Sequence, residues 1–373
     1  MNVIYGAGAA GVIIQNYLLK KGEEVDFFID DNKVLVGTCL QGIRVYAFEQ
    51  IKNRLHESDN IYCSFTTGLQ VRTLDALKDI GCNVFERDDL KDWEDGFIHS
   101  KNFIEIDESY LIGRNALLDK HYKGFKKLRG KVILVTGGAG SIGSEIIRSL
   151  LSFDVKNIIA IDIDESRLYE LSESFNSKNL ECLLCDISNQ VEVESLFKKF
   201  NINMIFHAAA YKHVPMTDLN PHKPLVNNIL GSINILKLAL SHQVESLLLI
   251  STDKAVRPTN LMGASKRIIE KIYSSYSKES TQIRIVRFGN VLKSRGSAIP
   301  KFINQALRGV NITLTDSDMT RYFMTIEEAA YLSVKSAVLP ESRYNTFVLN
   351  MGNPHRIIDI IERIKIFYEL DHL

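Results

Sequence analysis

The sequence predicts an α/β protein with two Rossmann-like domains. Two segments share one order of elements: a short β-branched strand, a glycine-rich turn, an amphipathic helix and a strand that ends in an acidic residue. They are NVIYGAGAAGVIIQNYLLKKGEEVDFFIDD, from residue 2, and KVILVTGGAGSIGSEIIRSLLSFDVKNIIAIDID, from residue 131. Strands and helices continue to alternate after the second segment, which is typical of a doubly wound parallel sheet.

The first domain is expected over residues 1–107, as a small Rossmann-like sheet of about four or five strands. NIYCSF and CNVFE have strand patterns, and TTGLQVRTLDALKDIG has a helix pattern between them. Gly6, Gly8 and Gly11, with Asp30, have the spacing of a dinucleotide motif. No paired acid and base residues follow in this domain, so we favour a structural or regulatory nucleotide-like fold over a second catalytic cofactor site.

The second domain is expected over residues 131–373, after a connecting segment at 108–130 that is basic and lacks a strand pattern. Its sheet should use strands at 158–163, 180–185, 203–207, 245–250 and 282–287 after the first one. Helices are expected at 166–175, 190–200, 222–242 and 261–277. The pattern becomes irregular after about residue 290, as expected for a partial substrate-covering subdomain.

The composition is that of a globular protein, and its charge balance does not favour a highly charged partner. Of the 373 residues, 45% are hydrophobic and 24% are charged, and 45 basic residues balance 45 acidic ones. This balance argues against nucleic acid and anionic lipid as partners. The sequence has no apolar run long enough for a membrane span and no signal peptide, so we expect a cytoplasmic chain.

The five cysteines are scattered, which suits reduced thiols. Cys182 and Cys185 have metal-ligand spacing, but they lie in a run that reads as a strand, where residues three apart face opposite sides. We therefore expect buried structural thiols and no metal site.

The second glycine motif predicts a cofactor site. Gly137, Gly140 and Gly143 would admit a pyrophosphate, and Asp162, nineteen residues after the last glycine, would bind the adenosine ribose of NAD. Arg167 leaves NADP open. The remaining residues expected at this cofactor are Ser141, Ile142, Asp186 and Ile187. Asp186 would meet the adenine edge, although capping of the next helix explains it equally well.

Five ordered motifs carry a family resemblance: TGGAGSIGSE, FHAAAYKHVPMTDLNP, STDKAVRPTNLMGASKR, VRFGNVLKSRGSAIP and MTRYFMTIEEAA. Together they resemble the extended short-chain dehydrogenase/reductases of polysaccharide biosynthesis, specifically UDP-N-acetylglucosamine 4,6-dehydratases, from about residue 105 to the C-terminus. The N-terminal domain resembles the extra domain of the long members, which begin with membrane helices absent from this sequence. The resemblance implies NAD, UDP-N-acetylglucosamine, a homo-oligomer, and full-length relatives anchored on the cytoplasmic face of the inner membrane.

The resemblance also implies the catalytic groups. Thr252 is expected to hydrogen-bond the 4-hydroxyl group of the sugar, Asp253 to protonate the departing 6-hydroxyl, and Lys254 to take the proton of carbon 5. Lys266, four residues after Met262, is expected to hold the nicotinamide ribose. Met262 stands where many relatives have a tyrosine; it cannot titrate, so Asp253 or a water relay through Thr252 should take the first proton. Methionine here is similar to the long members that retain the configuration of carbon 5.

Further contacts are implied on the same basis. Ala208, Ala209 and Ala210 should let the backbone lie against the cofactor. The expected substrate-side residues are Lys212, His213, Asn228, Asn290, Arg295, Ser297 and Arg321. Lys293 departs from the family pattern, because a small glycine is common at its position.

Two other functions are open. One is a UDP-sugar 4-epimerase or reductase, against which Thr252-Asp253-Lys254 and the missing tyrosine argue. The other is a non-catalytic nucleotide-sugar-binding relative, which the short C-terminal region favours: the sequence stops after LNMGNPHRIIDIIERIKIFYEL, where family members continue, so we expect a trimmed or naturally short chain.

Overall fold

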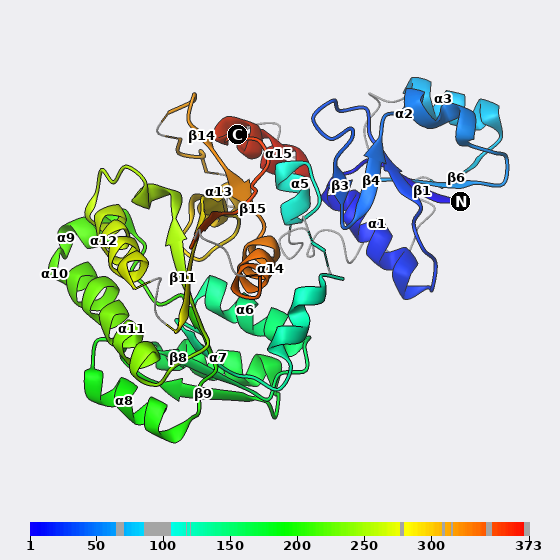
Figure 1. Cartoon of the computed structure of the whole chain (residues 1–373). Coiled ribbons are helices and arrows are strands. Elements are labelled where there is room, and N and C mark those ends of the chain that lie inside the picture. Colours follow the sequence, from blue (N-terminus) through cyan, green and yellow to red (C-terminus); the bar gives the residue numbers. More distant parts are fainter. Residues whose placement is uncertain are drawn as a thin grey trace. The chain divides into compact units, whose positions relative to one another are not determined.

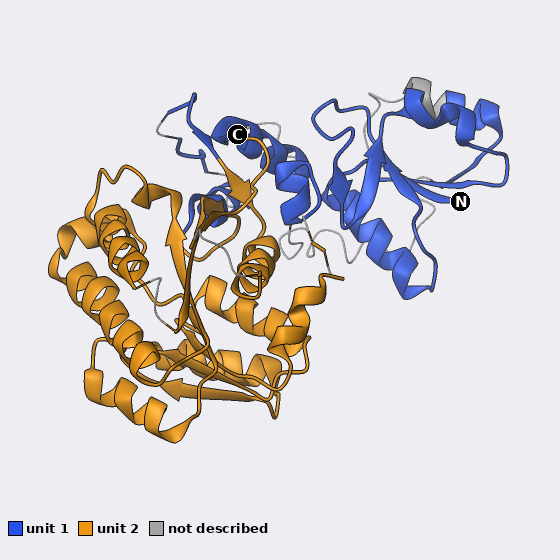
Figure 2. Cartoon of the chain, in the orientation of Figure 1, with its two compact units in different colours: residues 1–116, 297–321, 354–373 blue, residues 117–296, 322–353 orange. Residues whose placement is uncertain are grey.

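The computed structural model describes residues 1–64, 71–85, 106–116, 118–119, 121–276, 280–307, 310–314, 316–340 and 345–368. It divides into two compact units (Figure 2). Unit 1 comprises Met1–Ala116, Ser297–Arg321 and Pro354–Leu373, and unit 2 comprises Leu117–Gly296 and Tyr322–Asn353. The units therefore group distant parts of the sequence, whereas the domain boundaries expected from the sequence are continuous.

Unit 1 contains a sheet with the order β3-β4-β2-β1-β5-β6. Its pairings are parallel except for the hairpin between β3 and β4. The strands are β1 Asn2–Tyr5, β2 Phe27–Ile29, β3 Cys39–Leu40, β4 Ile43–Tyr46, β5 Asn60–Cys63 and β6 Asn83–Phe85. The helices of this part are α1 Ala9–Lys20, α2 Phe48–Ile51, the 3-10 turn η1 Lys52–Arg54 and α3 Val71–Ile80. The hairpin, which we did not expect, makes the sheet larger than the four or five strands predicted.

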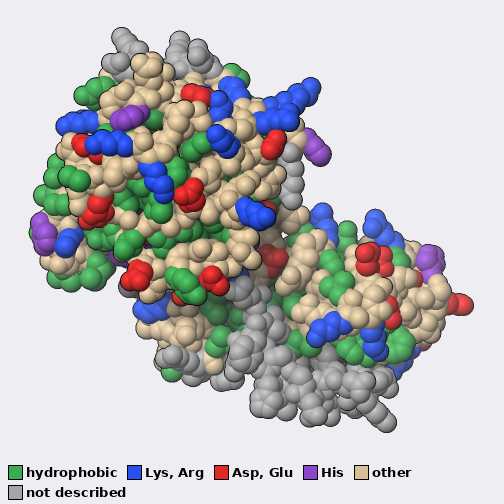
Figure 3. Space-filling view, turned by 90° about the horizontal axis from the view of Figure 1, so that it is seen from below, with side chains coloured by type: hydrophobic (Ala, Val, Ile, Leu, Met, Phe, Trp, Pro, Cys, Tyr) green, Lys and Arg blue, Asp and Glu red, His purple; other side chains and the backbone are tan. Residues whose placement is uncertain are grey.

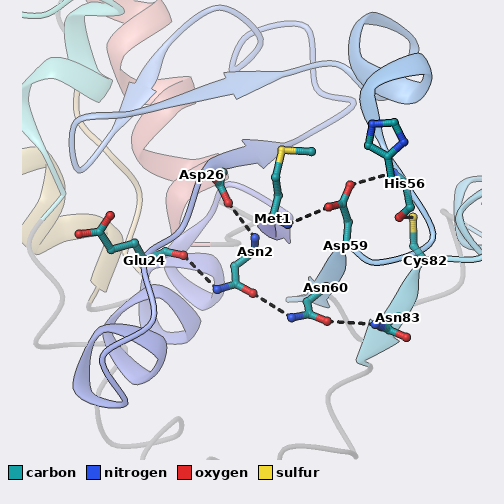
Figure 4. Close-up of polar contacts among 9 residues, drawn as sticks. All are labelled: Met1, Asn2, Glu24, Asp26, His56, Asp59, Asn60, Cys82 and Asn83. Atoms are coloured by element: carbon teal, nitrogen blue, oxygen red, sulfur yellow. Dashed lines mark hydrogen bonds and ion pairs between the residues drawn. The ribbon is translucent and has the colours of Figure 1, made fainter.

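An asparagine ladder crosses three strands of this sheet (Figure 4). Asn60 donates its side-chain amide to Asn2 Oδ1 at 3.0 Å, and Asn83 donates to Asn60 Oδ1 at 3.2 Å. The three residues are also partners in the strand register. Because a slip of one residue would turn these side chains to the other face, the ladder favours the observed register.

The other parts of unit 1 come from the middle and end of the sequence. They are α5 Glu108–Ile112, α13 Ala298–Leu307, β14 Thr320–Arg321, β17 His355–Arg356 and α15 Ile357–Phe367. Strands β14 and β17 pair antiparallel. The ring of Tyr110 on α5 meets Phe367 on α15 edge to face at 5.4 Å, and Arg363 Nη1 donates to the carbonyl oxygen of Leu111 at 2.8 Å. The segment expected to be a connection thus begins with a helix that packs within unit 1.

Unit 2 is a doubly wound sheet with the order β16-β12-β11-β10-β7-β8-β9. Helices lie on both sides of this sheet (Figure 1). All its pairings are parallel. The strands are β7 Val132–Thr136, β8 Asn157–Asp162, β9 Leu180–Leu184, β10 Met204–His207, β11 Ser246–Thr252, β12 Gln282–Phe288 and β16 Thr346–Val348. Short strands β13 Asn290–Val291 and β15 Phe323–Met324 form a separate pair. The α/β prediction is confirmed, and the predicted strands lie within one or two residues of the observed ones.

Helices cover both faces of this sheet. One apolar cluster joins the sheet to α6 Ser141–Leu151, α7 Glu165–Phe175 and α14 Ile326–Ala337. The other joins it to α8 Gln190–Lys199, α11 Ser232–Ser241 and α12 Leu261–Ser275. The remaining helical segments are η5 Lys123–Leu128, α9 Val214–Leu219, α10 His222–Pro224 and η7 Asp253–Ala255. Burial on both faces explains the continuous apolar runs of the central strands.

The predicted helix at 222–242 is wrong in one respect. A π-helix, η6 Leu225–Gly231, stands between α10 and α11. Its Asn228 is buried, with 1% of its surface exposed, and its side chain makes hydrogen bonds to other elements. π-Helical turns are rare and frequently lie at functional sites, which an amphipathic pattern does not reveal.

The two cysteines that have metal-ligand spacing differ in burial. Cys185 is buried and Cys182 is half-buried rather than buried, and burial raises the pKa of Cys185 to about 12. Figure 3 shows basic and acidic side chains interspersed over the face in view, as the balanced composition requires. Among the helices that the structure describes, none combines the length and the apolar character that crossing a membrane requires.

The start of α12 depends on a side-chain cap. Asn260 Oδ1 accepts a hydrogen bond from the backbone N–H of Gly263 at 2.9 Å. Replacing Asn260 by Ala should lower the free energy of unfolding by about 1 kcal/mol, whereas Asn260→Asp should keep most of it, because aspartate caps equally well. Urea unfolding measures both; an alanine variant as stable as the wild type would contradict the capping role.

Candidate active site

The glycine turn between β7 and α6 has a backbone that only glycine adopts easily. Gly137 has φ +65°, and a Cβ atom there would lie 2.7 Å from the backbone nitrogen of Ala209. A Cβ atom on Gly143 would lie 2.1 Å from the carbonyl oxygen of Gly137. Close approach of three backbone segments therefore requires glycine at both positions.

Asp162 ends β8 and braces the same turn. Its Oδ2 accepts the backbone N–H of Ala139 at 3.1 Å, and its Oδ1 accepts those of Ile163 at 2.8 Å and Asp164 at 3.1 Å. These bonds hold a carboxylate beside the glycine turn, where a dinucleotide-binding fold places the acid that meets the ribose.

The N-terminus of α6 fits an anionic group. Gly140 is its N-cap, without a side-chain hydrogen bond, and no acidic residue lies in the first turn, which begins with Ser141 and Ile142. Such a helix end favours negative charge. The backbone N–H of Arg295 donates to Ser141 Oγ at 3.1 Å, so the loop after β13 reaches this turn. The residues present therefore fit the pyrophosphate of a dinucleotide.

Two of the residues predicted to bind the cofactor, Arg167 and Asp186, bond to residues close to them in the sequence. Arg167 pairs with Asp164 at 3.2 Å and is exposed. Asp186 Oδ1 accepts from both the backbone and the hydroxyl group of Ser188 at 2.8 and 2.7 Å. The N-cap of α8 is Asn189, so Asp186 closes the preceding turn and does not cap the helix.

Ile187 follows β9, and the alanine run at 208–210 follows β10. Ile187 is buried and its carbonyl oxygen accepts the side-chain amide of Asn234 at 3.0 Å. Ala208 donates its N–H to the carbonyl oxygen of Thr136 at 3.1 Å, while Ala209 and Ala210 remain half-exposed after β10. The backbone of this run thus lies directly against the glycine turn.

A hydrogen-bonded chain links the turn to the π-helix through His207, which the sequence analysis did not select. Ala209 N–H donates to Thr136 Oγ1 at 3.2 Å, and Thr136 Oγ1 lies 2.7 Å from His207 Nδ1. His207 Nε2 lies 2.7 Å from Ser232 Oγ, which donates to the carbonyl oxygen of Asn228 at 2.5 Å. The donor order requires a neutral imidazole protonated at Nε2. Burial, and then the charge of Lys266, lower the pKa of His207 to about 3, which agrees with this state.

The end of β11 brings together the three expected acid/base residues. Thr252 Oγ1 donates to Asp253 Oδ1 at 2.9 Å, and Lys254 Nζ lies 3.2 Å from the same oxygen. Lys254 Nζ also donates to Asn290 Oδ1 at 3.2 Å. Both charged side chains are partly exposed, at 42% for Asp253 and 37% for Lys254. The charged pair is therefore open to solvent and close to one of the expected substrate residues.

Helix α12 presents Met262 and Lys266 to this region. Met262 is buried, with 4% of its surface exposed. Lys266 is also buried, and its ammonium group donates to the carbonyl oxygen of Ile250 on β11 at 3.0 Å. Burial lowers the pKa of Lys266 to about 8, against the opposing effect of Glu270. The lysine expected to hold the ribose thus also holds the active-site strand.

Asn228, one of the expected substrate-side residues, braces the loop after β10. It accepts the N–H of Tyr211 at 2.8 Å, and its amide donates to the carbonyl oxygen of Tyr211 and to Ser265 Oγ, both at 3.1 Å. Its side chain is therefore committed to protein groups, which makes it a positioning residue in this structure.

Cationic groups gather around Lys212. Burial of the ammonium group, followed by the charges of Arg295 and Arg167, lowers the pKa of Lys212, although the residue as a whole is exposed. The ring of His213 lies under Gly296, where a Cβ atom would come within 2.4 Å of Cε1. Several cations in one place favour an anionic ligand such as a diphosphate.

Two predicted substrate residues belong to unit 1. Ser297 has a buried hydroxyl group without a hydrogen-bond partner in the described structure. Arg321 is exposed and donates to the carbonyl oxygen of Thr320 at 2.8 Å. The other predicted residues all lie in unit 2.

Lys293, which departs from the family pattern, has φ +51°. This left-handed conformation is one that glycine adopts without cost. The backbone therefore keeps the shape of a glycine turn although the residue is a lysine.

The parallel sheet, the glycine turn with Asp162, and the lysine on the helix after β11 define a class: an extended short-chain dehydrogenase/reductase type of Rossmann fold. Residues 133–372 match the model of the family described as "Polysaccharide biosynthesis protein", and the chain belongs to that family.

Relatives agree with this assignment. The chain is 38% identical over 291 residues to the capsular polysaccharide biosynthesis protein CapD of Staphylococcus aureus, a match that covers 76% of this chain and 48% of CapD. It is 34% identical over 210 residues to UDP-glucose 4-epimerase of Rickettsia massiliae, covering 54% and 61%. The X-ray structure of Pen from Bacillus thuringiensis matches with a TM-score of 0.61 and 34% identity, covering 66% of this chain and 76% of Pen. The chain thus spans about half the length of CapD.

Two glycines with similar φ give a matched test of the turn. Gly137→Ala should weaken NAD binding by at least about tenfold, because its Cβ atom would displace Ala209. Gly130 has φ +68° but nothing within 4 Å of a Cβ atom. Gly130→Ala should therefore cost about 1–2 kcal/mol of stability and leave NAD affinity unchanged. Calorimetric titration with NAD measures both, and equal affinities for the two variants would refute the role of the turn.

Proposed function

We propose that this protein is a nucleotide-sugar 4,6-dehydratase that converts UDP-N-acetylglucosamine to UDP-2-acetamido-2,6-dideoxy-4-hexulose. The observation that carries the proposal is the group at the end of β11, where Thr252, Asp253 and Lys254 lie within hydrogen-bonding distance of one another. Elimination of water needs an acid for the departing 6-hydroxyl group and a base for the proton of carbon 5, whereas epimerisation at carbon 4 needs only a group for the 4-hydroxyl proton.

The cofactor in this proposal is NAD. The glycine turn of Gly137, Gly140 and Gly143 would hold its pyrophosphate, and Asp162 would bind the adenosine ribose, a role in which a carboxylate disfavours the 2′-phosphate of NADP. Lys266 would hold the nicotinamide ribose. When bound, NAD accepts the hydride of carbon 4 and returns it to carbon 6.

The proton transfers balance with two residues. Asp253 begins as a carboxylate and takes the proton of the 4-hydroxyl group, which Thr252 orients. Lys254, whose ammonium group first releases a proton to solvent as the substrate separates it from Asp253, takes the proton of carbon 5. Asp253 then gives its proton to the departing 6-hydroxyl group, which leaves as water. Lys254 returns its proton to carbon 5, so both residues end the transfers in the protonation state in which they entered them.

The contacts of Lys254 support a paired resting state of the two groups in this proposal. The ammonium group of Lys254 pairs with Asp253 and also contacts Asn290. A lysine acts as a base only after losing its proton, so substrate binding must separate this pair and exclude water from it.

Met262 supports the assignment of the first proton to Asp253. A thioether cannot take a proton, and Met262 on α12 is buried. Asp253 is the nearest ionisable partner of Thr252 among the described residues. If Asp253 takes the 4-hydroxyl proton and later gives it to the 6-hydroxyl group, no titrating residue is needed at position 262.

The cations near Lys212 support a diphosphate in the substrate. The charge of Arg295 contributes to the lowered pKa of Lys212, and Arg295 reaches the glycine turn through its backbone. In this proposal Arg295, Lys212 and His213 contact the diphosphate or sugar, with Asn290 near the reacting carbons. For Ser297 and Arg321 a substrate contact stays a prediction from the sequence.

A UDP-sugar 4-epimerase is the second candidate, because the relative from Rickettsia massiliae bears that name. The two functions differ in the product. An epimerase returns the hydride to carbon 4 and releases no water, so it needs a group for the 4-hydroxyl proton but no base at carbon 5.

The decisive assay is incubation with NAD and UDP-N-acetylglucosamine. We expect a product lighter by one water with a new methyl signal in the NMR spectrum. Asp253→Asn and Lys254→Ala should each lower turnover on the order of 100-fold or more while NAD affinity stays unchanged. Asp218→Asn, which changes an exposed residue of α9, is the control. A product epimeric at carbon 4, or no product despite bound NAD and sugar nucleotide, would reject the dehydratase.

Deuterated water tests the role of Lys254. One deuteron should enter carbon 5 of most product molecules, because the amine of Lys254 exchanges its protons for solvent deuterons before the substrate excludes water. If one residue both removes and returns this proton, it acts on one face and the configuration of carbon 5 is retained. NMR of the product reads both the label and the stereochemistry; inversion at carbon 5 would require a second proton donor.

A further inference from the structure

Two successive turns of α12 hold two successive residues of β11. Lys266 donates to the carbonyl oxygen of Ile250 at 3.0 Å. One turn later, Glu270 Oε1 accepts the hydroxyl proton of Ser251 at 2.7 Å. The next residue of the strand is Thr252, where the acid/base group begins. The helix therefore fixes the strand immediately before the reacting residues.

Glu270 also binds the neighbouring strand. Arg287 on β12 is the register partner of Ser251. It donates to Glu270 through Nε at 2.7 Å and Nη2 at 2.6 Å, which is a two-pronged contact of the strong kind. Arg267 adds a weaker contact at 3.3 Å from the helix surface. One carboxylate thus joins three elements: α12, β11 and β12.

The environment shows that this carboxylate is ionised. Only 3% of the Glu270 side chain is exposed. Burial alone would raise its pKa, but the hydrogen bonds from Arg287 and Ser251 outweigh burial, and the pKa is lowered. A charge kept in the interior in this way is costly unless every partner is in place, so the contacts must be made together.

We propose that Glu270 is a positioning residue of the active site: it holds the end of β11 so that Thr252 and Asp253 face the substrate, and its negative charge keeps Lys266 protonated. The proposal rests on the proposed function, in which Thr252 and Lys266 take part. The glycine motif and the acid/base group at the end of β11 do not by themselves predict an acidic residue at position 270.

The electrostatic part follows from the groups around Lys266. Burial lowers the pKa of Lys266 to about 8, and Glu270 raises it against that effect. The other charged or titratable groups nearby are His207 on β10, which is neutral, Arg267 on α12, Arg287 on β12, and the pair Asp253 and Lys254 after β11. Glu270 supplies the opposing negative charge on the same face of α12, one turn from the lysine.

The test is Glu270→Gln, which keeps the shape of the side chain and removes its charge. Without the negative charge, charged Lys266 is less favourable, so its pKa should fall by roughly one unit. Lysine labelled with 13C and titrated by NMR reports this directly, with the Lys266 signal identified by its loss in Lys266→Arg. The alkaline limb of the kcat/KM profile should move to lower pH by the same amount.

Arg267→Gln is the control, because it removes a contact to the same carboxylate but leaves Glu270 charged and bound to Arg287. Its Lys266 titration should match that of the wild type. If Glu270→Gln fails to fold, Glu270→Gln/Arg287→Gln replaces the ion pair without leaving a buried charge. It should show the same direction of shift, because the carboxylate is absent in both.

The outcomes separate this proposal from the proposed function. A lower melting temperature in Glu270→Gln with an unmoved Lys266 titration would mean a merely structural role and would overturn the proposal. A wild-type protein without dehydratase activity would overturn the proposed function, while the NMR titration would still decide whether Glu270 controls the charge of Lys266.

Discussion

Parallel pairing of β11 with β10 and β12 is the constraint on which the active site depends. All seven strands of the unit 2 sheet run in one direction, so their carboxyl ends meet along one edge. The glycine turn follows β7, Asp162 ends β8, the alanine run follows β10, and Thr252 ends β11. Residues more than a hundred positions apart are neighbours because each stands where its strand stops.

Polar groups buried beneath that edge make it rigid. The chain from Ala209 through His207 to Asn228 connects the glycine turn to the π-helix. The Glu270 carboxylate connects α12 with two strands. An unpaired polar group in the interior is costly, so these networks favour one arrangement of the elements that carry the site. The Asp253–Lys254 pair, in contrast, is partly exposed to solvent.

The periodicity of the apolar residues and the spacing of the glycines were sufficient to predict most of the fold. The strands of unit 2 are short apolar runs between turn residues, and the strand ends agree with the predicted ones closely. The π-helix at Leu225–Gly231 could not be predicted, because its sequence continues an amphipathic pattern on both sides. The sequence also could not predict that one unit combines the first 116 residues with Ser297–Arg321 and Pro354–Leu373. Packing between distant segments decides this grouping.

By itself, the sequence determined the class of fold, the position of the glycine turn and the ionisable residues after β11, because these depend on local spacing and on residue chemistry. Only the tertiary structure decided which groups meet. It showed that Asp186 closes its own turn, that Lys266 holds β11, that Lys293 adopts a left-handed backbone, and that Glu270 and His207 lie at the centre of buried networks. The physical reason is that a hydrogen bond needs two partners, and a linear pattern shows at most one of them.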